Sequence, residues 1–312
     1  MLNESLLVDE FLDRCRAVAE EIPCMVEIVI VDDGSTDGTL ELLKSICDNW
    51  TSASEVELVV LSLSRNFGHQ SAMLAGLAQA RGAYAVTLDG DLQDPPETIA
   101  ALFQLMLEKD ADVVSARRVR RNGENRLKRF TASFFYRALS LMAEVKLPHD
   151  VGDFRIMNRR TLDLLIEFSE DGKYLRGLVP WLGGVQLYIA YDREERKRGH
   201  SKFTMSKMVS LAGDALASFS LRPLKLALWL SVVSFVLSIL AGAWAVGAWL
   251  AGDSLTGWAS LVGLVSFFSS ITYAIFAILG LYIGRIHKNV MRRPQWVTRE
   301  VFGNRPLDPK KL

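Results

Sequence analysis

The chain has 312 residues, half of them hydrophobic, with 36 basic and 36 acidic side chains. Its mean hydropathy of +0.17 is high for a soluble enzyme, and its zero net charge gives no overall field that favours nucleic acid. The three cysteines, Cys15, Cys24 and Cys47, form neither a disulfide framework nor a zinc-binding pattern. The composition therefore argues against a nucleic-acid-binding protein and against a disulfide-rich secreted domain.

Apolar patterns in the first 120 residues predict helices that alternate with short strands. They indicate helices at 4–21, 39–50, 70–80 and 97–109, and strands at 25–31, 58–63, 84–88 and 112–116. This alternation is typical of an α/β fold with a Rossmann-like, mostly parallel, doubly wound sheet. Later patterns predict a basic helix at 125–144, strands at 152–157 and 185–191, and a short helix at 162–168.

Two aspartates, Asp89 and Asp91, follow the strand predicted at 84–88, and Pro95 and Pro96 then open a helix. In open α/β sheets, ligands bind at the carboxyl ends of the strands. Carboxylate oxygens at such a position suit Mg²⁺ or Mn²⁺, held together with the phosphates of a substrate. Taken alone, the same Asp-x-Asp pattern also fits a solvated acidic turn.

A second acidic loop, with Asp32 and Asp33, follows the strand predicted at 25–31. Both acidic loops are expected to face the same crevice, because the strands end at the same edge of the sheet. Carboxylates of this loop could accept hydrogen bonds from a nucleobase or a ribose. The alternative for Asp32 and Asp37 is turn formation and capping of the following helix.

Two long apolar runs, residues 226–252 and 254–284, contain no charged residue. Each exceeds the length of about 20 residues that crosses a bilayer, so two transmembrane helices are predicted at about 226–250 and 259–284. The alternative is a pair of deeply buried core helices. Basic residues flank the pair on both sides: Arg222, Lys225, Arg285, Lys288, Arg292 and Arg293. The positive-inside rule then predicts a multi-pass protein of the inner, cytoplasmic membrane whose catalytic domain faces the cytoplasm.

Apolar residues recur at helical spacing between Met205 and Phe219, with polar residues between them. This pattern predicts a juxtamembrane amphipathic helix, which would lie in the membrane interface or pack against the sheet. Three cations near this segment, Arg193, Lys197 and Lys207, are interpreted as a basic collar for anionic lipid head groups.

Six motifs occur in order along the chain: Val31–Ser35, Arg65–Gly68, Asp89–Glu97, Gly152–Arg155, Leu175–Trp181 and Arg198–Lys202. Together they resemble the family 2 (GT-A) glycosyltransferases that charge a polyprenyl phosphate. The most similar branch is that of the GtrB-type undecaprenyl-phosphate glucosyltransferases, akin to dolichol-phosphate mannose synthases. The resemblance covers about residues 2–300, including both apolar runs.

The resemblance implies an enzyme that transfers a sugar, with inversion, from a nucleotide sugar to a polyprenyl phosphate. A divalent cation, Mg²⁺ or Mn²⁺, would stabilise the leaving diphosphate. By resemblance, Asp91 is its main ligand and acts in catalysis, with Asp89 and Gln93 on the metal or on the sugar phosphate of the donor. Glu4, Asp32 and Asp33 match residues that contact the nucleotide.

The acceptor is an anion, so cations are expected around it. By resemblance, the residues that bind its phosphate are Arg117, Lys128, Arg129, Arg198, Ser201 and Lys202. Asp153 occupies the position usually assigned as catalytic base. An ionised phosphate needs a strong base less than a sugar hydroxyl does, so Asp153 could instead position the acceptor or pair with Arg155.

The resemblance also predicts the domain boundaries: a GT-A domain at 1–203, the juxtamembrane helix at 204–222, the transmembrane pair at 223–288 and a cytoplasmic tail at 289–312. Members of this family begin with an apolar strand that ends in Pro-x-Tyr-Asn-Glu, whereas this chain begins Met-Leu-Asn-Glu. We therefore expect the first strand to be missing, through a start site assigned too late or a truncation.

The predicted donor is UDP-glucose, and the alternatives are GDP-mannose or a nucleotide carrying a modified arabinose. A homo-oligomer is possible by resemblance. A hypothesis of another class is a non-catalytic membrane scaffold, which the complete set of Asp89, Asp91 and Asp153 disfavours.

Overall fold

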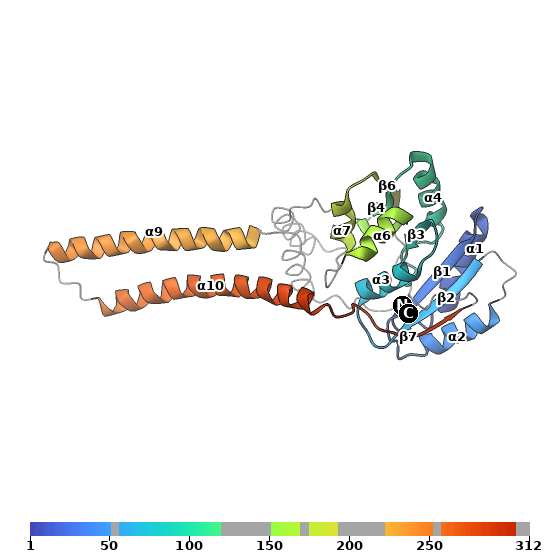
Figure 1. Ribbon diagram of the computed structural model, residues 1–312, viewed down its shortest axis with the longest axis horizontal. Helices are drawn as coiled ribbons and strands as arrows, with labels where there is room; N and C mark the ends of the chain where they lie inside the picture. Colours follow the sequence, from blue (N-terminus) through green and yellow to red (C-terminus); the bar gives the residue numbers. More distant parts are fainter. Residues whose placement is uncertain (51–55, 120–150, 169–174, 193–221, 252–256, 304–312) are drawn as a thin grey trace. The chain divides into compact units, whose positions relative to one another are not determined.

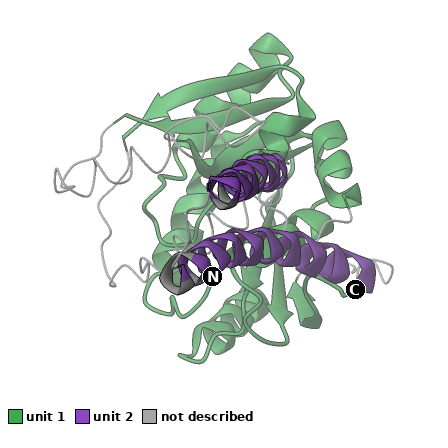
Figure 2. Cartoon of the chain, turned by 90° about the vertical axis from the view of Figure 1, so that its left-hand side faces the viewer, with its two compact units in different colours: residues 1–130, 145–202, 292–312 green, residues 131–144, 203–291 purple. Residues whose placement is uncertain are grey.

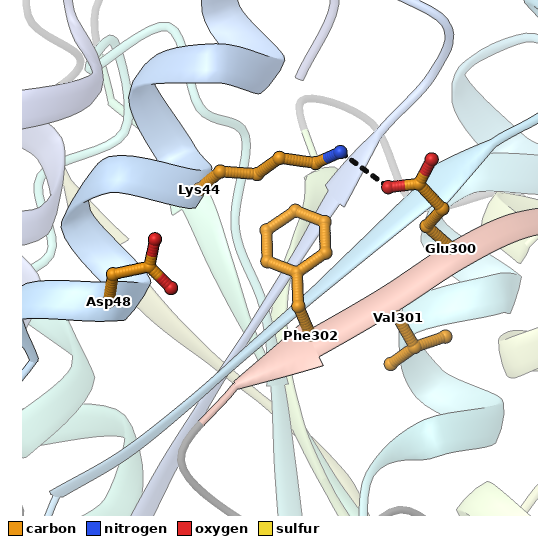
Figure 3. A pocket seen from close by; sticks show the side chains of 5 residues that line it. All are labelled: Lys44, Asp48, Glu300, Val301 and Phe302. Carbon is orange, nitrogen blue, oxygen red and sulfur yellow. Dashed lines mark hydrogen bonds and ion pairs between the residues drawn. The ribbon is translucent and has the colours of Figure 1, made fainter.

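The computed structural model describes residues 1–50, 56–119, 151–168, 175–192, 222–251 and 257–303. The chain divides into two compact units, which Figure 2 colours green and purple. Unit 1 comprises residues 1–130, 145–202 and 292–312, and unit 2 comprises residues 131–144 and 203–291. The helices predicted at 125–144 and 204–222 lie outside the described residues, apart from Arg222.

The first sheet of unit 1 has three strands, with β2 in the middle (Figure 1). β2 pairs in parallel with β1 and antiparallel with β7. The strands span Val26–Asp32 (β1), Val56–Leu63 (β2) and Thr298–Gly303 (β7). The sequence predicts only a tail where β7 lies, because a short edge strand with two apolar residues gives a weak pattern.

The second sheet has the strand order β3-β5-β4-β6. These strands span Tyr84–Thr87 (β3), Val113–Arg118 (β4), Val151–Asn158 (β5) and Gln186–Tyr191 (β6). β5 runs antiparallel to both β3 and β4, whereas β4 and β6 are parallel. The α/β class is confirmed, but the sheets are mixed rather than mostly parallel. β3 and β4 keep the parallel direction that a helical crossover gives, and β5 inserts between them in the opposite direction.

Six helices of unit 1 are described, and most agree with the predicted ranges. They span Val8–Glu21 (α1), Thr39–Asn49 (α2), His69–Gln79 (α3), Thr98–Lys109 (α4), Arg159–Glu167 (α6) and Leu175–Leu182 (α7). α7 was not predicted as a helix, because Gly177 and Pro180 interrupt its apolar pattern.

The core of unit 1 is built on both faces of β2. Leu58 and Val60 point into one cluster, together with residues of α1 and α2. Val59 and Leu61 belong to a second cluster with α3. All four side chains are fully buried, which explains why β2 is a nearly continuous apolar run. The sheet is thus covered on both faces and leaves the strand ends to carry function.

Unit 2 contains two long apolar helices in contact with one another, α9 (Arg222–Leu250) and α10 (Trp258–Met291). Their segments Ala227–Ala248 and Gly263–Met291 are long and apolar enough to cross a membrane, and neither window is buried inside the protein. A buried core pair would hide its apolar side chains, so the exposed ones fit a lipid environment better. The prediction of two apolar helices is confirmed, and they associate the protein with a membrane.

Candidate active site

The loop after β1 holds two aspartates predicted to contact a nucleotide. Asp33 is buried, and its carboxylate accepts hydrogen bonds from the backbone amides of Phe67, at 2.7 Å, and Gly68, at 3.0 Å. Asp32 is also buried and accepts a bond of 3.3 Å from the amide of Ser35. Both carboxylates therefore help to build the loop, and Asp33 joins it to the loop after β2.

Residues 1–5 run alongside the loop after β1. The amide of Asn3 donates to Oγ of Ser35 at 2.9 Å, and the amide of Glu4 donates to Oγ1 of Thr39 at 3.1 Å. Glu4 is half-buried. The backbone of Glu4 is therefore fixed to the start of α2, directly after the loop that carries the two aspartates with which it was predicted to act.

Met1 lies between the two acidic loops. Its amino group donates to the carbonyl of Val31, and its carbonyl accepts a bond of 2.9 Å from the amide of Asp33. Its side chain packs on the second loop, because a Cβ added at Gly90 would lie 2.7 Å from Cγ of Met1. The carboxyl ends of β1 and β3 are thus close together, as the strand-end pattern predicts.

The loop after β3 carries the residues predicted to hold a metal. Oδ1 of Asp91 accepts a hydrogen bond of 3.1 Å from the amide of Gln93, and the turn is fixed by Leu92, whose side chain is buried and whose φ is +56°. Oδ1 of Asp89 is buried without a hydrogen bond and lies 3.5 Å from Nε2 of His69. Burial raises the pKa of Asp89 above its ordinary value.

The loop after β3 offers oxygen ligands that suit a divalent cation. In the residues that the structure describes, no three or more His, Cys, Asp and Glu side chains are grouped to hold a metal ion. The loop nevertheless offers the hard oxygens of Asp89 and Asp91, and one buried oxygen of Asp89 has no hydrogen-bond donor. Mg²⁺ is commonly held by one or two carboxylates and completes its shell with phosphates and water, so this donor pair fits it.

Asp153, on β5, is a buried acid of the site. Its side chain is 1% exposed and accepts hydrogen bonds from Arg176. Nη2 of Arg176 lies 2.7 Å from Oδ2, and Nε lies 3.1 Å from both carboxylate oxygens. Nε2 of His69 lies 3.3 Å from Oδ2, and Nη2 of Arg155 lies 3.5 Å from Oδ1. Burial alone would raise the pKa of Asp153, but the bonds from His69 and Arg176 and the nearby cations hold it far below its ordinary value.

Gln70 joins the elements around Asp153. Its Nε2 donates to Oδ2 of Asp153 at 3.4 Å, and its Oε1 accepts a bond of 3.1 Å from the amide of Leu175. The start of α3, the start of α7 and strand β5 therefore meet at one carboxylate. The hydrogen bond between His69 and Asp153 raises the pKa of the His69 imidazole and favours its charged form.

The two arginines at the end of β4, both interpreted from the sequence as phosphate-binding cations, lie in different surroundings. Arg117 is exposed, and the phosphate-binding role predicted for it stays a prediction. Arg118 instead turns inward, and its Nε donates to the hydroxyl of Tyr191 at 3.2 Å, while Tyr191 donates to Asp94. The remaining predicted acceptor residues lie outside the described residues: Lys128, Arg129, Arg198, Ser201 and Lys202. The role of Arg176 was missed, although its motif at 175–181 pointed to the segment.

Comparisons with known proteins agree with this geometry. Residues 1–165 match the model of the glycosyl transferase family 2 domain. An uncharacterized glycosyltransferase, YkcC of Bacillus subtilis, is 36% identical over 99% of this chain and 94% of its own length. The SfII prophage-derived bactoprenol glucosyl transferase of Shigella flexneri is 34% identical over 98% of this chain and 97% of its own.

Among solved structures, the crystal structure of S. aureus TarS residues 1–349 covers 70% of this chain and 62% of that one, with a TM-score of 0.43 and 18% identity. The family match spans more than half of the chain and includes both acidic loops and β5. The protein is a glycosyltransferase, and the chain belongs to glycosyl transferase family 2.

Proposed function

We propose that this protein transfers a hexose from a nucleotide sugar to undecaprenyl phosphate or a related polyprenyl phosphate, with inversion at the anomeric carbon. The donor we favour is UDP-glucose, with Mg²⁺ or Mn²⁺ as cofactor. The observation that carries the proposal is the similarity to a bactoprenol glucosyl transferase over nearly the whole of both chains. That similarity includes the apolar helices α9 and α10, which a lipid acceptor would require.

The donor would lie across the two acidic loops that Met1 brings together. The nucleoside is proposed to bind at one end of this region, beside Glu4, Asp32 and Asp33. Asp89 and Asp91, with Gln93, would hold a divalent cation on the diphosphate at the other end. When bound, the cation would neutralise the charge that develops on the leaving diphosphate.

The acceptor needs no strong base. A phosphate monoester is already ionised at neutral pH and attacks through an oxygen that loses no proton in the transition state. Asp153, enclosed by Arg176 and His69, is suited to orienting cations rather than to accepting a proton. We propose that Arg117, Lys128, Arg129, Arg198, Ser201 and Lys202 bind the phosphate of the lipid.

We propose that both helices cross the inner membrane as a hairpin, with the catalytic unit in the cytoplasm. Lys225 precedes most of α9, and Arg285 and Lys288 lie in the last two turns of α10, so both ends of the hairpin are basic. β7 follows α10 in the chain after a short segment and pairs with β2 of unit 1.

The test is transfer of radiolabelled sugar to undecaprenyl phosphate in isolated membranes that contain the full chain. UDP-glucose and GDP-mannose are compared, each with Mg²⁺, Mn²⁺ or EDTA. Label that enters the lipid from UDP-glucose only, and only with a metal, supports the proposal. Transfer from GDP-mannose alone would show that the donor sugar is mannose instead of glucose. Transfer that EDTA leaves unchanged would contradict the proposed metal dependence.

A further inference from the structure

Arg176 and His69 present the accessible positive groups of the Asp153 cluster. The carboxylate of Asp153 is 1% exposed, whereas the side chains of Arg176 and His69 are 38% and 53% exposed. An anion that approaches this cluster therefore meets the guanidinium and the imidazole rather than the carboxylate. The ligand that a guanidinium binds best is a phosphate or carboxylate anion, because its planar fork matches their oxygens.

Asp153 fixes the direction of this guanidinium. It engages both Nε and Nη2 of Arg176, at 3.1 Å and 2.7 Å, so the planar group is held along one edge. Asp153 is held in turn by Gln70 and Arg155, at 3.4 Å and 3.5 Å. A cation fixed before its ligand arrives loses less side-chain entropy on binding than a mobile one.

His69 connects Arg176 to the acidic loop after β3. Oδ2 of Asp153 lies 2.7 Å from Nη2 of Arg176 and 3.3 Å from Nε2 of His69. The same nitrogen of His69 lies 3.5 Å from Oδ1 of Asp89. Asp153 and His69 therefore link Arg176, through three contacts, to the loop at which the diphosphate is proposed to bind.

From this geometry we infer that Arg176 binds phosphate oxygens of the reacting substrates and that Asp153 is its positioning residue. The inference deepens the proposed function and rests on it. Two sources supply the same ligand chemistry: the diphosphate of the donor and the phosphate monoester of the lipid acceptor. Both reach the reaction centre, and the experiment below separates them.

The experiment measures transfer by the full chain in membranes for wild type, Arg176→Ala, Arg176→Lys, Asp153→Asn and the double variant. Arg160→Ala is the matched control, because Arg160 is an exposed arginine in the first turn of α6. The KM values of donor and acceptor are measured separately, together with inhibition by UDP. A thermal unfolding curve for each variant identifies loss of fold.

We expect Arg176→Ala to lower kcat/KM by roughly 10- to 100-fold, the value of a hydrogen bond to a charged group. Arg176→Lys should recover part of this loss, because it keeps the charge but not the fork. Asp153→Asn should affect the same kinetic constants, and the double variant should be no worse than the poorer single one, since the two residues act as a unit. Arg160→Ala should match wild type.

The kinetic constant that changes shows whether Arg176 binds the diphosphate of the donor or the phosphate of the lipid acceptor. A raised acceptor KM with unchanged inhibition by UDP assigns Arg176 to the lipid phosphate. Weaker inhibition by UDP with an unchanged acceptor KM assigns it to the donor. The inference is overturned if Arg176→Ala leaves kcat/KM, both KM values and the inhibition by UDP unaltered. It is also overturned if the loss of kcat/KM in the double variant equals the product of the losses in the two single variants. If Asp153→Asn fails to fold, the two Arg176 variants still show whether Arg176 binds a phosphate of the substrates.

Failure of the proposed function gives a different result. In that case the wild-type protein transfers no sugar from either nucleotide, and binding of UDP to the purified protein replaces the kinetic readout. UDP affinity that is equal in wild type and Arg176→Ala would then reject Arg176 as a ligand of the donor diphosphate.

Discussion

Asp33 and Gly68 are 35 residues apart in sequence, yet the carboxylate of the first accepts a 3.0 Å hydrogen bond from the backbone amide of the second. A further bond of 2.7 Å comes from the amide of Phe67. The acid predicted to touch the nucleotide thus also holds together two loops that end neighbouring strands.

Asp33→Ala should lower the free energy of unfolding by about 2–4 kcal/mol, because it leaves two backbone amides without their acceptor. Asp33→Asn keeps one carbonyl oxygen and should lose less. Chemical unfolding of the detergent-solubilised protein measures both. Equal stability of wild type and Asp33→Ala would contradict the structural role of this carboxylate.

Gly34 and Gly38, in the same loop, allow the effect of a backbone contact on stability to be separated from that of backbone strain. Both have left-handed φ, +73° and +89°, so alanine costs about 1–2 kcal/mol of backbone strain at either site. Only at Gly34 would the new Cβ meet backbone, 2.7 Å from the carbonyl carbon of Arg65. We expect Gly34→Ala to destabilise the protein clearly more than Gly38→Ala and to raise the donor KM. Unfolding curves and donor titrations check this, and equal losses would exclude the contact.

Asp91→Ala should reduce sugar transfer by about 100-fold or more, since it removes the proposed main ligand of the cation that stabilises the leaving diphosphate. Membrane insertion should be unchanged. Asp13→Ala is the control, because Asp13 is an exposed acid of α1. Transfer assays and membrane fractionation provide the two measurements. Metal-dependent turnover that survives in Asp91→Ala would overturn the assignment.

Asp37 gives a prediction for pH. Partial burial opposes the effect, but hydrogen bonds from Thr39 and Ser5 lower the pKa of Asp37 to about 2. The unfolded value is about 3.9, so the ionised form stabilises the fold fully above that pH and loses its effect as pH falls through 2. The stability difference between wild type and Asp37→Asn should therefore shrink between about pH 5 and pH 2. The side chain is exposed, so the difference is small; unfolding midpoints across this range measure it.

Lys202→Ala should raise the KM of the polyprenyl phosphate and leave the KM of the nucleotide sugar unchanged, because Lys202 is proposed to attract the anionic phosphate of the acceptor. Lys109→Ala, at an exposed residue at the end of α4, is the control. Steady-state transfer with each substrate varied in turn separates the two constants. An unchanged acceptor KM would remove Lys202 from the acceptor site.

The sequence by itself determined the α/β class, most of the elements and the two apolar helices. Strands such as β2 are buried on both faces and therefore read as continuous apolar runs. Residues 226–250 of α9 and 258–284 of α10 contain no charged side chain. The acidic strand ends were also visible, because Asp89, Asp91, Asp32 and Asp33 directly follow such runs. These features depend on local chemistry, which a chain displays along its length.

Only the tertiary structure decided how strands pair and which side chains share a site. The mixed direction of the second sheet and the place of β7 depend on contacts between distant segments, which leave no local pattern. The contact of Asp153 with Arg176, His69 and Gln70 joins β5, α7 and α3 in the same way. The sequence predicts a catalytic role for Asp153 but not its surroundings. Its enclosure by cations, on which the proposed positioning role rests, arises from packing across those three elements.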